Sequence, residues 1–142
     1  MIEKRNRLIL TVLLFCWLFS ANVVSEELKP FTSDGCSAFP DGNLKQKNLW
    51  QGCCLAHDLA YWKGGTYQER LQADRQLEAC VESVGEPTIA KLMLAGVRVG
   101  GSPFWPTEFR WGYGWPYFRF YKAITEQEQK MINQLMDAGK VK

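Results

Sequence analysis

Four side chains capable of acid–base, thiol or metal chemistry lie within six positions of the sequence: Cys53, Cys54, His57 and Asp58. His57 is the only histidine of the chain, and histidine is the side-chain type that exchanges protons near neutral pH. When a buried carboxylate holds one ring nitrogen, the other nitrogen can act as a general base. No GxSxG segment for a nucleophilic serine occurs, so such a base would most simply activate water.

A helix is expected to carry this cluster. Apolar residues recur at i, i+3, i+4 and i+7 spacing between Leu49 and Tyr61, which predicts an amphipathic helix. Asn43 and Gln46 resemble a capping box, so we expect the helix to begin there. The glycine pair at 64–65 is expected to end it.

A second helix should follow at once, because residues 66–69 form another capping box. Two helices joined by so short a turn must be antiparallel, so residues equally far from the turn face each other. This register places Asp74 across from His57 and Cys80 across from Cys53. The sequence alone therefore predicts a histidine–aspartate pair between the two helices.

Asp58 is expected to point away from Asp74 and toward the loop that contains Cys36. A carboxylate that faces free backbone carbonyls forms a hard-oxygen site, which suits calcium. A cation held there could polarise an ester carbonyl. The alternative is a surface carboxylate near Lys63.

The N-terminus has the pattern of a secretory signal, with basic residues followed by the apolar run 8–19. We expect residues 1–25 to be a signal peptide cleaved after Ser25, which leaves residues 26–142 as one secreted or periplasmic domain. Without cleavage, residues 8–24 are just long enough to anchor the protein, which would then be a membrane-tethered structural protein. Cleavage lowers the formal net charge from +2 to zero, which argues against a nucleic-acid partner.

Four cysteines remain after cleavage, and an even number in an exported chain indicates two disulfides. Cys54 lies on a helix face about 100° from that of Cys53, which leaves it free to bond Cys36. The expected pairs are Cys36–Cys54 and Cys53–Cys80. The alternative is a metal cluster of cysteine and histidine.

The second half of the chain holds three further patterns. Pro87 opens an apolar helix to about Val99, which is expected to be well buried. Residues 100–122 hold ten aromatics among Gly and Pro, and Thr125 with Glu128 caps a last helix. The aromatic stretch is either core and covering loop or a surface for lipid headgroups. The candidates for such a surface are Trp105, Trp111, Trp115 and Tyr117, interleaved with Arg110, Arg119 and Lys122.

The residues around the histidine resemble a known family. CCLAHDLAY is similar to the CCxxHDxCY signature of the secreted phospholipase A2 family, and ADRQLEAC is similar to its later CDxxxxxC segment. The resemblance covers roughly residues 34–82. It implies a small, mostly α, disulfide-stapled domain that hydrolyses the sn-2 ester of glycerophospholipids at a membrane or micelle surface. The products would be a fatty acid and a lysophospholipid.

The resemblance also implies a role for each matching residue. His57 would activate water, Asp74 would orient His57, and Tyr61 would hydrogen-bond Asp74. Asp58 would bind Ca²⁺ together with loop carbonyls, here those of Gly35, Ser37 and Phe39. The alternatives are a salt bridge between Asp74 and Arg70 and simple core packing of Tyr61.

The chain departs from the family pattern in three places. Ala60 and Ala73 stand where the family has a bonded cysteine pair, and the hairpin register places them face to face. The β-wing between the two helices is absent. Ser37 and Phe39 replace loop glycines, which adopt positive φ more readily. The altered loop favours an alternative function, a phospholipase-like module that binds lipid or protein with little or no catalysis.

Overall fold

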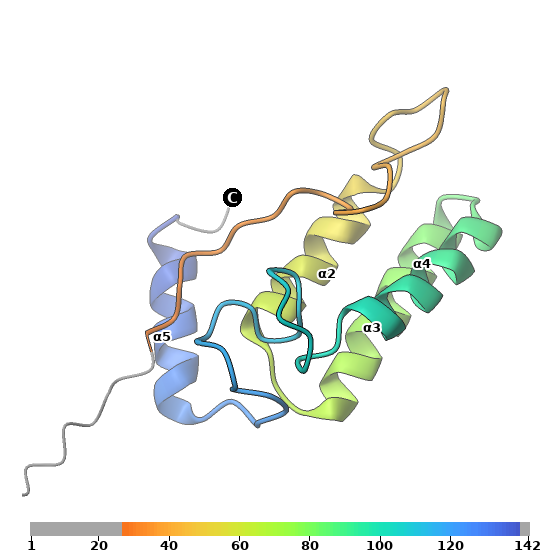
Figure 1. The fold of residues 1–142 in the computed structure, drawn as a ribbon. Helices are drawn as coiled ribbons and strands as arrows, with labels where there is room; N and C mark the ends of the chain where they lie inside the picture. Colours follow the sequence, from red (N-terminus) through yellow and green to blue (C-terminus); the bar gives the residue numbers. More distant parts are fainter. Residues whose placement is uncertain (1–26, 140–142) are drawn as a thin grey trace, which may run out of the picture.

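The computed structural model describes residues 27–139, which form four helices and no β-strand (Figure 1). The helices are α2 (Gln51–Lys63), α3 (Tyr67–Ser83), α4 (Pro87–Gly100) and α5 (Glu126–Asp137). The expected small, mostly α domain with two disulfides is confirmed. The predicted signal peptide, residues 1–25, lies outside the described residues. Within the described part, no helix has the length and hydropathy needed to cross a membrane.

α2 and α3 form the antiparallel pair that the sequence predicted. Gly64 (φ 69°) and Gly65 (φ 138°) end α2 with backbone angles that strain any residue with a side chain. The Thr66 side chain accepts from the Glu69 backbone N–H, and the Glu69 carboxylate accepts from the Thr66 N–H. This capping box starts α3 directly after the glycines, so the short turn fixes which residues of the two helices face each other.

Two disulfides staple this hairpin with the predicted pairing. Cys53–Cys80 joins α2 to α3 with Cα atoms 5.7 Å apart, and Cys36–Cys54 joins the preceding loop to α2 with Cα atoms 5.0 Å apart. Ala60 packs against the cluster that contains Ala73, so the positions that lack a third bridge do lie together.

The start of α2 differs from the prediction. The helix begins at Gln51, and its N-cap residue Trp50 makes no side-chain capping hydrogen bond. Asn43 Oδ1 does accept from the backbone N–H groups of Lys45 and Gln46, at 3.0 and 2.8 Å. These bonds close a local turn, because an asparagine side chain can satisfy the backbone of a turn as well as that of a helix.

α4 packs mainly against α3 and is more exposed than its composition predicted. Pro87 occupies its first turn, as expected. Only Ala90 and Met93 are buried, whereas Leu92 is 57% and Val99 is 72% exposed. The prediction of a well-buried helix is therefore wrong, because one side of α4 contacts α3 and much of the remainder faces outward (Figure 1).

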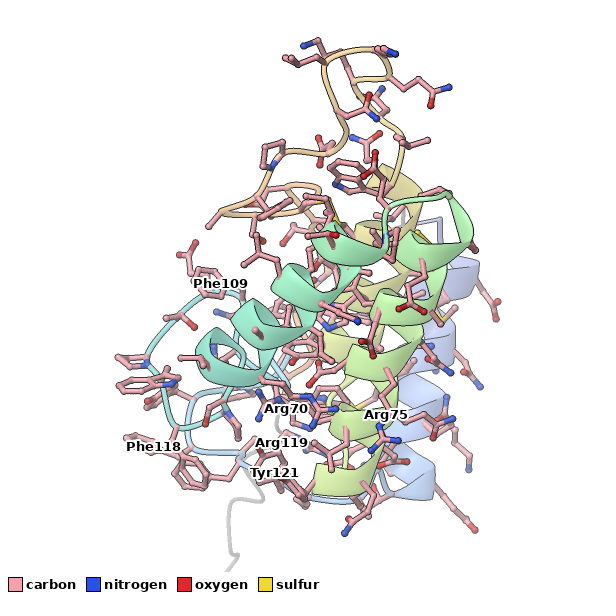
Figure 2. All side chains as sticks on the ribbon, turned by 90° about the vertical axis from the view of Figure 1, so that its right-hand side faces the viewer. Arg70, Arg75, Phe109, Phe118, Arg119 and Tyr121 are labelled. Atoms are coloured by element: carbon pink, nitrogen blue, oxygen red, sulfur yellow. A yellow bond between two sulfur atoms is a disulfide. The ribbon has the colours of Figure 1, made fainter. Side chains whose placement is uncertain are left out.

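The aromatic segment, residues 103–121, divides between core and surface. Trp111 and Trp115 are buried, and their indole N–H groups donate to backbone carbonyls at the α2–α3 turn. Arg119 is also buried, so these three belong to the core and not to a lipid-facing surface. Phe109 and Phe118 lie on the outer side of the segment (Figure 2). The exposed rings are those of Phe104, Trp105, Phe109, Tyr117 and Phe118.

α5 closes the domain on the side away from α4 (Figure 1). The predicted capping box of Thr125 and Glu128 starts it. Ile132 is fully buried in a cluster with residues from the N-terminal segment, α2 and the aromatic segment: Leu28, Phe31, Trp62 and Trp115. This cluster thus surrounds the C-terminal end of α2, and a second one, with Trp50 and Cys53, packs its N-terminal end against α3 and α4.

Candidate active site

His57 and Asp74 meet across the hairpin, as the sequence predicted. His57 Nε2 lies 3.0 Å from Asp74 Oδ1, and both side chains are buried. A carboxylate oxygen can only accept a hydrogen bond, so the neutral ring carries its proton on Nε2. No group among residues 27–139 hydrogen-bonds Nδ1, so this nitrogen is available as the acceptor that a general base requires.

Tyr61 contacts both members of this pair. Its hydroxyl donates to Asp74 Oδ1 at 2.7 Å, and its ring centroid lies 4.2 Å from that of His57. Burial, with the charge of Asp74, raises the pKa of Tyr61 above its ordinary value, so the phenol stays a neutral donor. Tyr61 also packs edge-on against Trp111 at 5.0 Å. Core packing and the expected hydrogen bond to Asp74 are therefore both present.

Two arginines complete the surroundings of Asp74. Arg98 of α4 places Nε 2.9 Å from Asp74 Oδ2, and Arg70 of α3 places Nε 4.0 Å from the same oxygen. From the sequence, an Asp74–Arg70 salt bridge was the alternative to a site role for Asp74. In the structure Asp74 makes both the salt bridge and the contact with His57. Sequence reasoning missed Arg98, because its position depends on how α4 crosses α3. The one available signal was a cation near the end of an apolar helix.

An apolar cavity of about 390 Å³ opens beside His57. Its walls come from α2, α3, α4, the loop before α2 and the aromatic segment; its apolar side chains include Phe39, Leu77, Leu92, Met93, Val97 and Phe109. Gly96 and Gly100 also line it, and nothing lies within 4 Å of where a Cβ atom would stand on either residue. A cavity of this size and polarity suits a hydrocarbon chain.

Asp58 faces the loop before α2, as predicted. Its hydrogen-bond partner is Ser33, whose Oγ donates to Asp58 Oδ2 at 2.6 Å, and not the Lys63 considered from the sequence. Asp58 lines both the apolar cavity and an adjoining cavity of about 530 Å³ with a more polar lining. Burial raises the pKa of Asp58 to about 6, and the charge of Asp34 adds to the rise.

The loop that faces Asp58 is held in a tight conformation. Gly35 (φ 82°) and Ser37 (φ 55°) have positive φ. A Cβ atom at Gly35 would lie 2.3 Å from Asp41 Oδ1, and that oxygen accepts from the Cys36 N–H at 2.8 Å. Glycine is therefore required at 35, whereas Ser37 holds an angle that favours glycine. The Ser37 hydroxyl donates to Asp34 at 2.8 Å.

Asp58 and this loop offer oxygen ligands of the kind that calcium takes. Among residues 27–139, no group donates to the carbonyl oxygens of Gly35, Ser37 and Phe39, and all three residues line the cavity beside Asp58. Unpaired carbonyls next to a carboxylate fit Ca²⁺. In the same range no three His, Cys, Asp or Glu side chains group as metal ligands, so a cation here would depend on backbone oxygens.

Comparisons of the chain with protein-family models, with curated proteins and with solved structures found no match. The case for a function therefore depends on the residues and the geometry described above.

Proposed function

We propose that this protein hydrolyses the sn-2 ester bond of glycerophospholipids in a calcium-dependent reaction. The observation that carries the proposal is the 3.0 Å contact between His57 Nε2 and Asp74 Oδ1 beside an apolar cavity. This contact leaves a free ring nitrogen next to a space that suits an acyl chain. The resemblance of CCLAHDLAY to the phospholipase A2 signature supports the same reaction class.

In the proposed reaction, His57 takes a proton from water through Nδ1, and the water oxygen attacks the ester carbonyl carbon. The bond to the glycerol oxygen breaks, and the proton returns to that oxygen, giving a fatty acid and a lysophospholipid. Asp74 holds the ring in the reactive tautomer and stabilises the transient imidazolium. The cysteines that line the cavity, Cys36 and Cys54, are bonded to each other, which favours water over a covalent nucleophile.

Calcium would be held by Asp58 and by the carbonyls of Gly35, Ser37 and Phe39. When bound, it would polarise the ester carbonyl and stabilise the negative charge that develops on its oxygen. The free carbonyls of the loop support this assignment.

The proposed partner is a phospholipid membrane or micelle surface. Leu92 and Phe109 line the cavity and are also 57% and 48% exposed, so the cavity mouth carries apolar side chains. The same segment exposes Phe104, Trp105 and Phe118, and Arg110 lies over the Tyr117 ring at 5.0 Å. Aromatic rings beside cations suit a headgroup boundary.

Export to a secreted or periplasmic location would bring the protein to such a surface. The two disulfides support export, because they persist in oxidising compartments.

A second candidate function is a catalytically weak or inactive module that binds lipid or a protein. One observation favours it: the 2.6 Å hydrogen bond from Ser33 already satisfies one oxygen of Asp58. A carboxylate engaged in this way has fewer lone pairs for a cation. The two candidates share the cavity and the aromatic surface, and they differ in whether His57 is needed.

The test is release of fatty acid from vesicles of 1-palmitoyl-2-oleoyl phospholipids of mixed head group. The purified protein is assayed with calcium, with EDTA, and as His57→Gln, with the exposed Arg75→Gln as the matched control. We expect oleate, not palmitate, to be released only when calcium and His57 are both present. Vesicle binding without release of either acid would favour the binding module. Palmitate release would contradict sn-2 specificity.

A further inference from the structure

We propose that Arg98, held in place by Arg70, is a positioning residue for His57. It fixes the Asp74 carboxylate so that Oδ1 faces the imidazole. The inference rests on the proposed function for its effect on rate, but not for its effect on the histidine ring. Arg98 belongs to α4, which lies outside the stretch that resembles phospholipase A2. The inference therefore gives α4 a role in orienting His57, the proposed base.

The two oxygens of Asp74 have separate partners. Oδ1 receives His57 Nε2 at 3.0 Å and the Tyr61 hydroxyl at 2.7 Å, whereas Oδ2 lies 2.9 Å from Arg98 Nε. The same guanidinium donates through Nη2 to the Leu71 carbonyl at 3.1 Å. Arg98 thus contacts α3 at two points, one ion pair and one hydrogen bond. Within residues 27–139, Asp74 Oδ2 and Arg98 Nε have no hydrogen-bond partner, so charge attraction alone holds Oδ2, and rotation of the carboxylate would take it out of the ion pair.

Arg70 in turn fixes the part of α4 that carries Arg98. It is buried, and its Nη2 donates to the carbonyls of Val97 and Arg98 at 2.8 and 2.9 Å, in the last turn of α4. Its Nε donates to the Tyr61 hydroxyl at 3.1 Å. Nη1 donates to Tyr121 of the aromatic segment at 2.7 Å, where the two side chains lie close together (Figure 2). One guanidinium therefore ties α4, the aromatic segment and Tyr61 to α3.

These contacts link the cavity wall to the base. Gly96, Val97 and Gly100 of α4 line the cavity, and Arg98 of the same turn contacts Asp74. A shift of α4 would therefore alter the cavity and the orientation of Asp74 together. Displacing a positioning group by about 1 Å is enough to lower a rate by on the order of 100-fold.

The experiment uses the fact that His57 is the only histidine, so one set of imidazole nitrogen signals reports its tautomer in untagged protein. We compare wild type, Arg98→Gln, Arg98→Lys and the exposed Arg75→Gln, which neighbours Asp74 in sequence. Arg98→Lys keeps the charge and the fold-stabilising attraction but loses the two-point attachment. It remains informative if Arg98→Gln fails to fold.

In wild type and Arg75→Gln we expect a single tautomer with the proton on Nε2. In the Arg98 variants we expect a second tautomer or exchange broadening. Their kcat should fall roughly 10- to 100-fold with KM nearly unchanged. Because the Arg98 side chain is 30% exposed, added methylguanidinium should restore part of the kcat of Arg98→Gln.

An unchanged ring spectrum in folded Arg98→Gln or Arg98→Lys would overturn the inference and leave Arg98 a role in stability only. If the ring spectrum changes but wild type hydrolyses no phospholipid, Arg98 still positions His57, and the proposed function is what fails. A fall in the melting temperature with unchanged spectrum and kcat would likewise contradict positioning.

Discussion

Two buried carboxylates in this small domain, Asp74 and Glu128, are both paired with arginine, yet their surroundings differ in kind. Asp74 is wholly buried and Glu128 is 7% exposed. The partners of Glu128 in the described part of the chain, Arg119, Lys122 and Thr125, do not line the cavity beside His57. Arg119 donates to its two oxygens at 2.6 and 3.1 Å, and the Thr125 N–H donates at 2.7 Å to cap α5. Asp74 instead uses one oxygen for an imidazole that lines a cavity.

The difference shows that a buried ion pair alone does not mark a functional site. Glu128 joins the aromatic segment to α5, because it pairs with Arg119 and caps the helix. What distinguishes Asp74 is its titratable partner beside an open apolar space. Substitutions at the two carboxylates and on the cavity wall test whether this distinction holds.

Replacing Asp74 by asparagine should have the largest effect. We expect the hydrolysis rate to fall roughly 10²- to 10⁴-fold, because the ring loses the partner that fixes its tautomer. Stability should fall by about 3 kcal/mol, since Arg98 and Arg70 then face a neutral group. Rates are measured at a temperature where the variant is folded by circular dichroism. A variant with wild-type rates would remove Asp74 from the mechanism.

Replacing Glu128 by glutamine should lower the free energy of unfolding by about 3 kcal/mol, because a buried ion pair with Arg119 loses one of its two charges. The hydrolysis rate of the folded protein should stay at the wild-type level, since within residues 27–139 no hydrogen-bond partner of Glu128 lines the cavity. Urea unfolding and vesicle hydrolysis check the two halves separately. A lower hydrolysis rate in fully folded Glu128→Gln would show that Glu128, like Asp74, affects the reaction and not stability alone.

The same pair predicts how stability depends on pH. The hydrogen bonds from Arg119 lower the pKa of Glu128 to about 2. A lowered folded-state pKa stabilises the fold above the unfolded pKa, about 4.3, and that stability is lost as pH falls toward 2. Urea unfolding should show a loss between about pH 5 and pH 2 that is smaller in Glu128→Gln. An equal loss in both proteins would assign the dependence to other carboxylates.

The smallest effect is expected at Gly96, on the cavity wall. Nothing surrounds the position of a Cβ atom there, and a helical glycine costs stability, so Gly96→Ala should stabilise the protein by about 0.5–1 kcal/mol. Gly96→Leu should fold equally well but slow hydrolysis of long acyl chains more than short ones, because its side chain would extend into the cavity. Equal slowing for all chain lengths would mean that the cavity does not hold the acyl chain.

The hairpin and its contacts could be predicted from sequence because a three-residue turn fixes the register of two helices. That register placed His57 across from Asp74 and Cys53 across from Cys80, and the helical phase of Cys54 left it free for Cys36. The position of Arg98 could not be predicted in this way, because apolar periodicity does not set the angle at which α4 crosses α3.

The start of α2, the aromatic segment and the exposure of α4 could not be predicted from local sequence patterns. The side chain of Asn43 closes a turn where a helix was expected, because the same hydrogen bonds suit both. Composition could not predict which aromatic side chains are buried and which are exposed. Trp111 is buried and Trp105 is exposed because of what packs against each of them. The exposure of α4 likewise depends on which elements cover it.

The most direct test of the account is the initial rate of oleate release from mixed vesicles by His57→Gln and Glu128→Gln, each at the same folded fraction as wild type and with calcium present. We predict that His57→Gln releases no oleate and is less stable by about 1–3 kcal/mol, because it removes a buried hydrogen bond to Asp74. We predict that Glu128→Gln releases oleate at the wild-type rate although it unfolds more easily. Oleate release by His57→Gln at the wild-type rate would contradict the account.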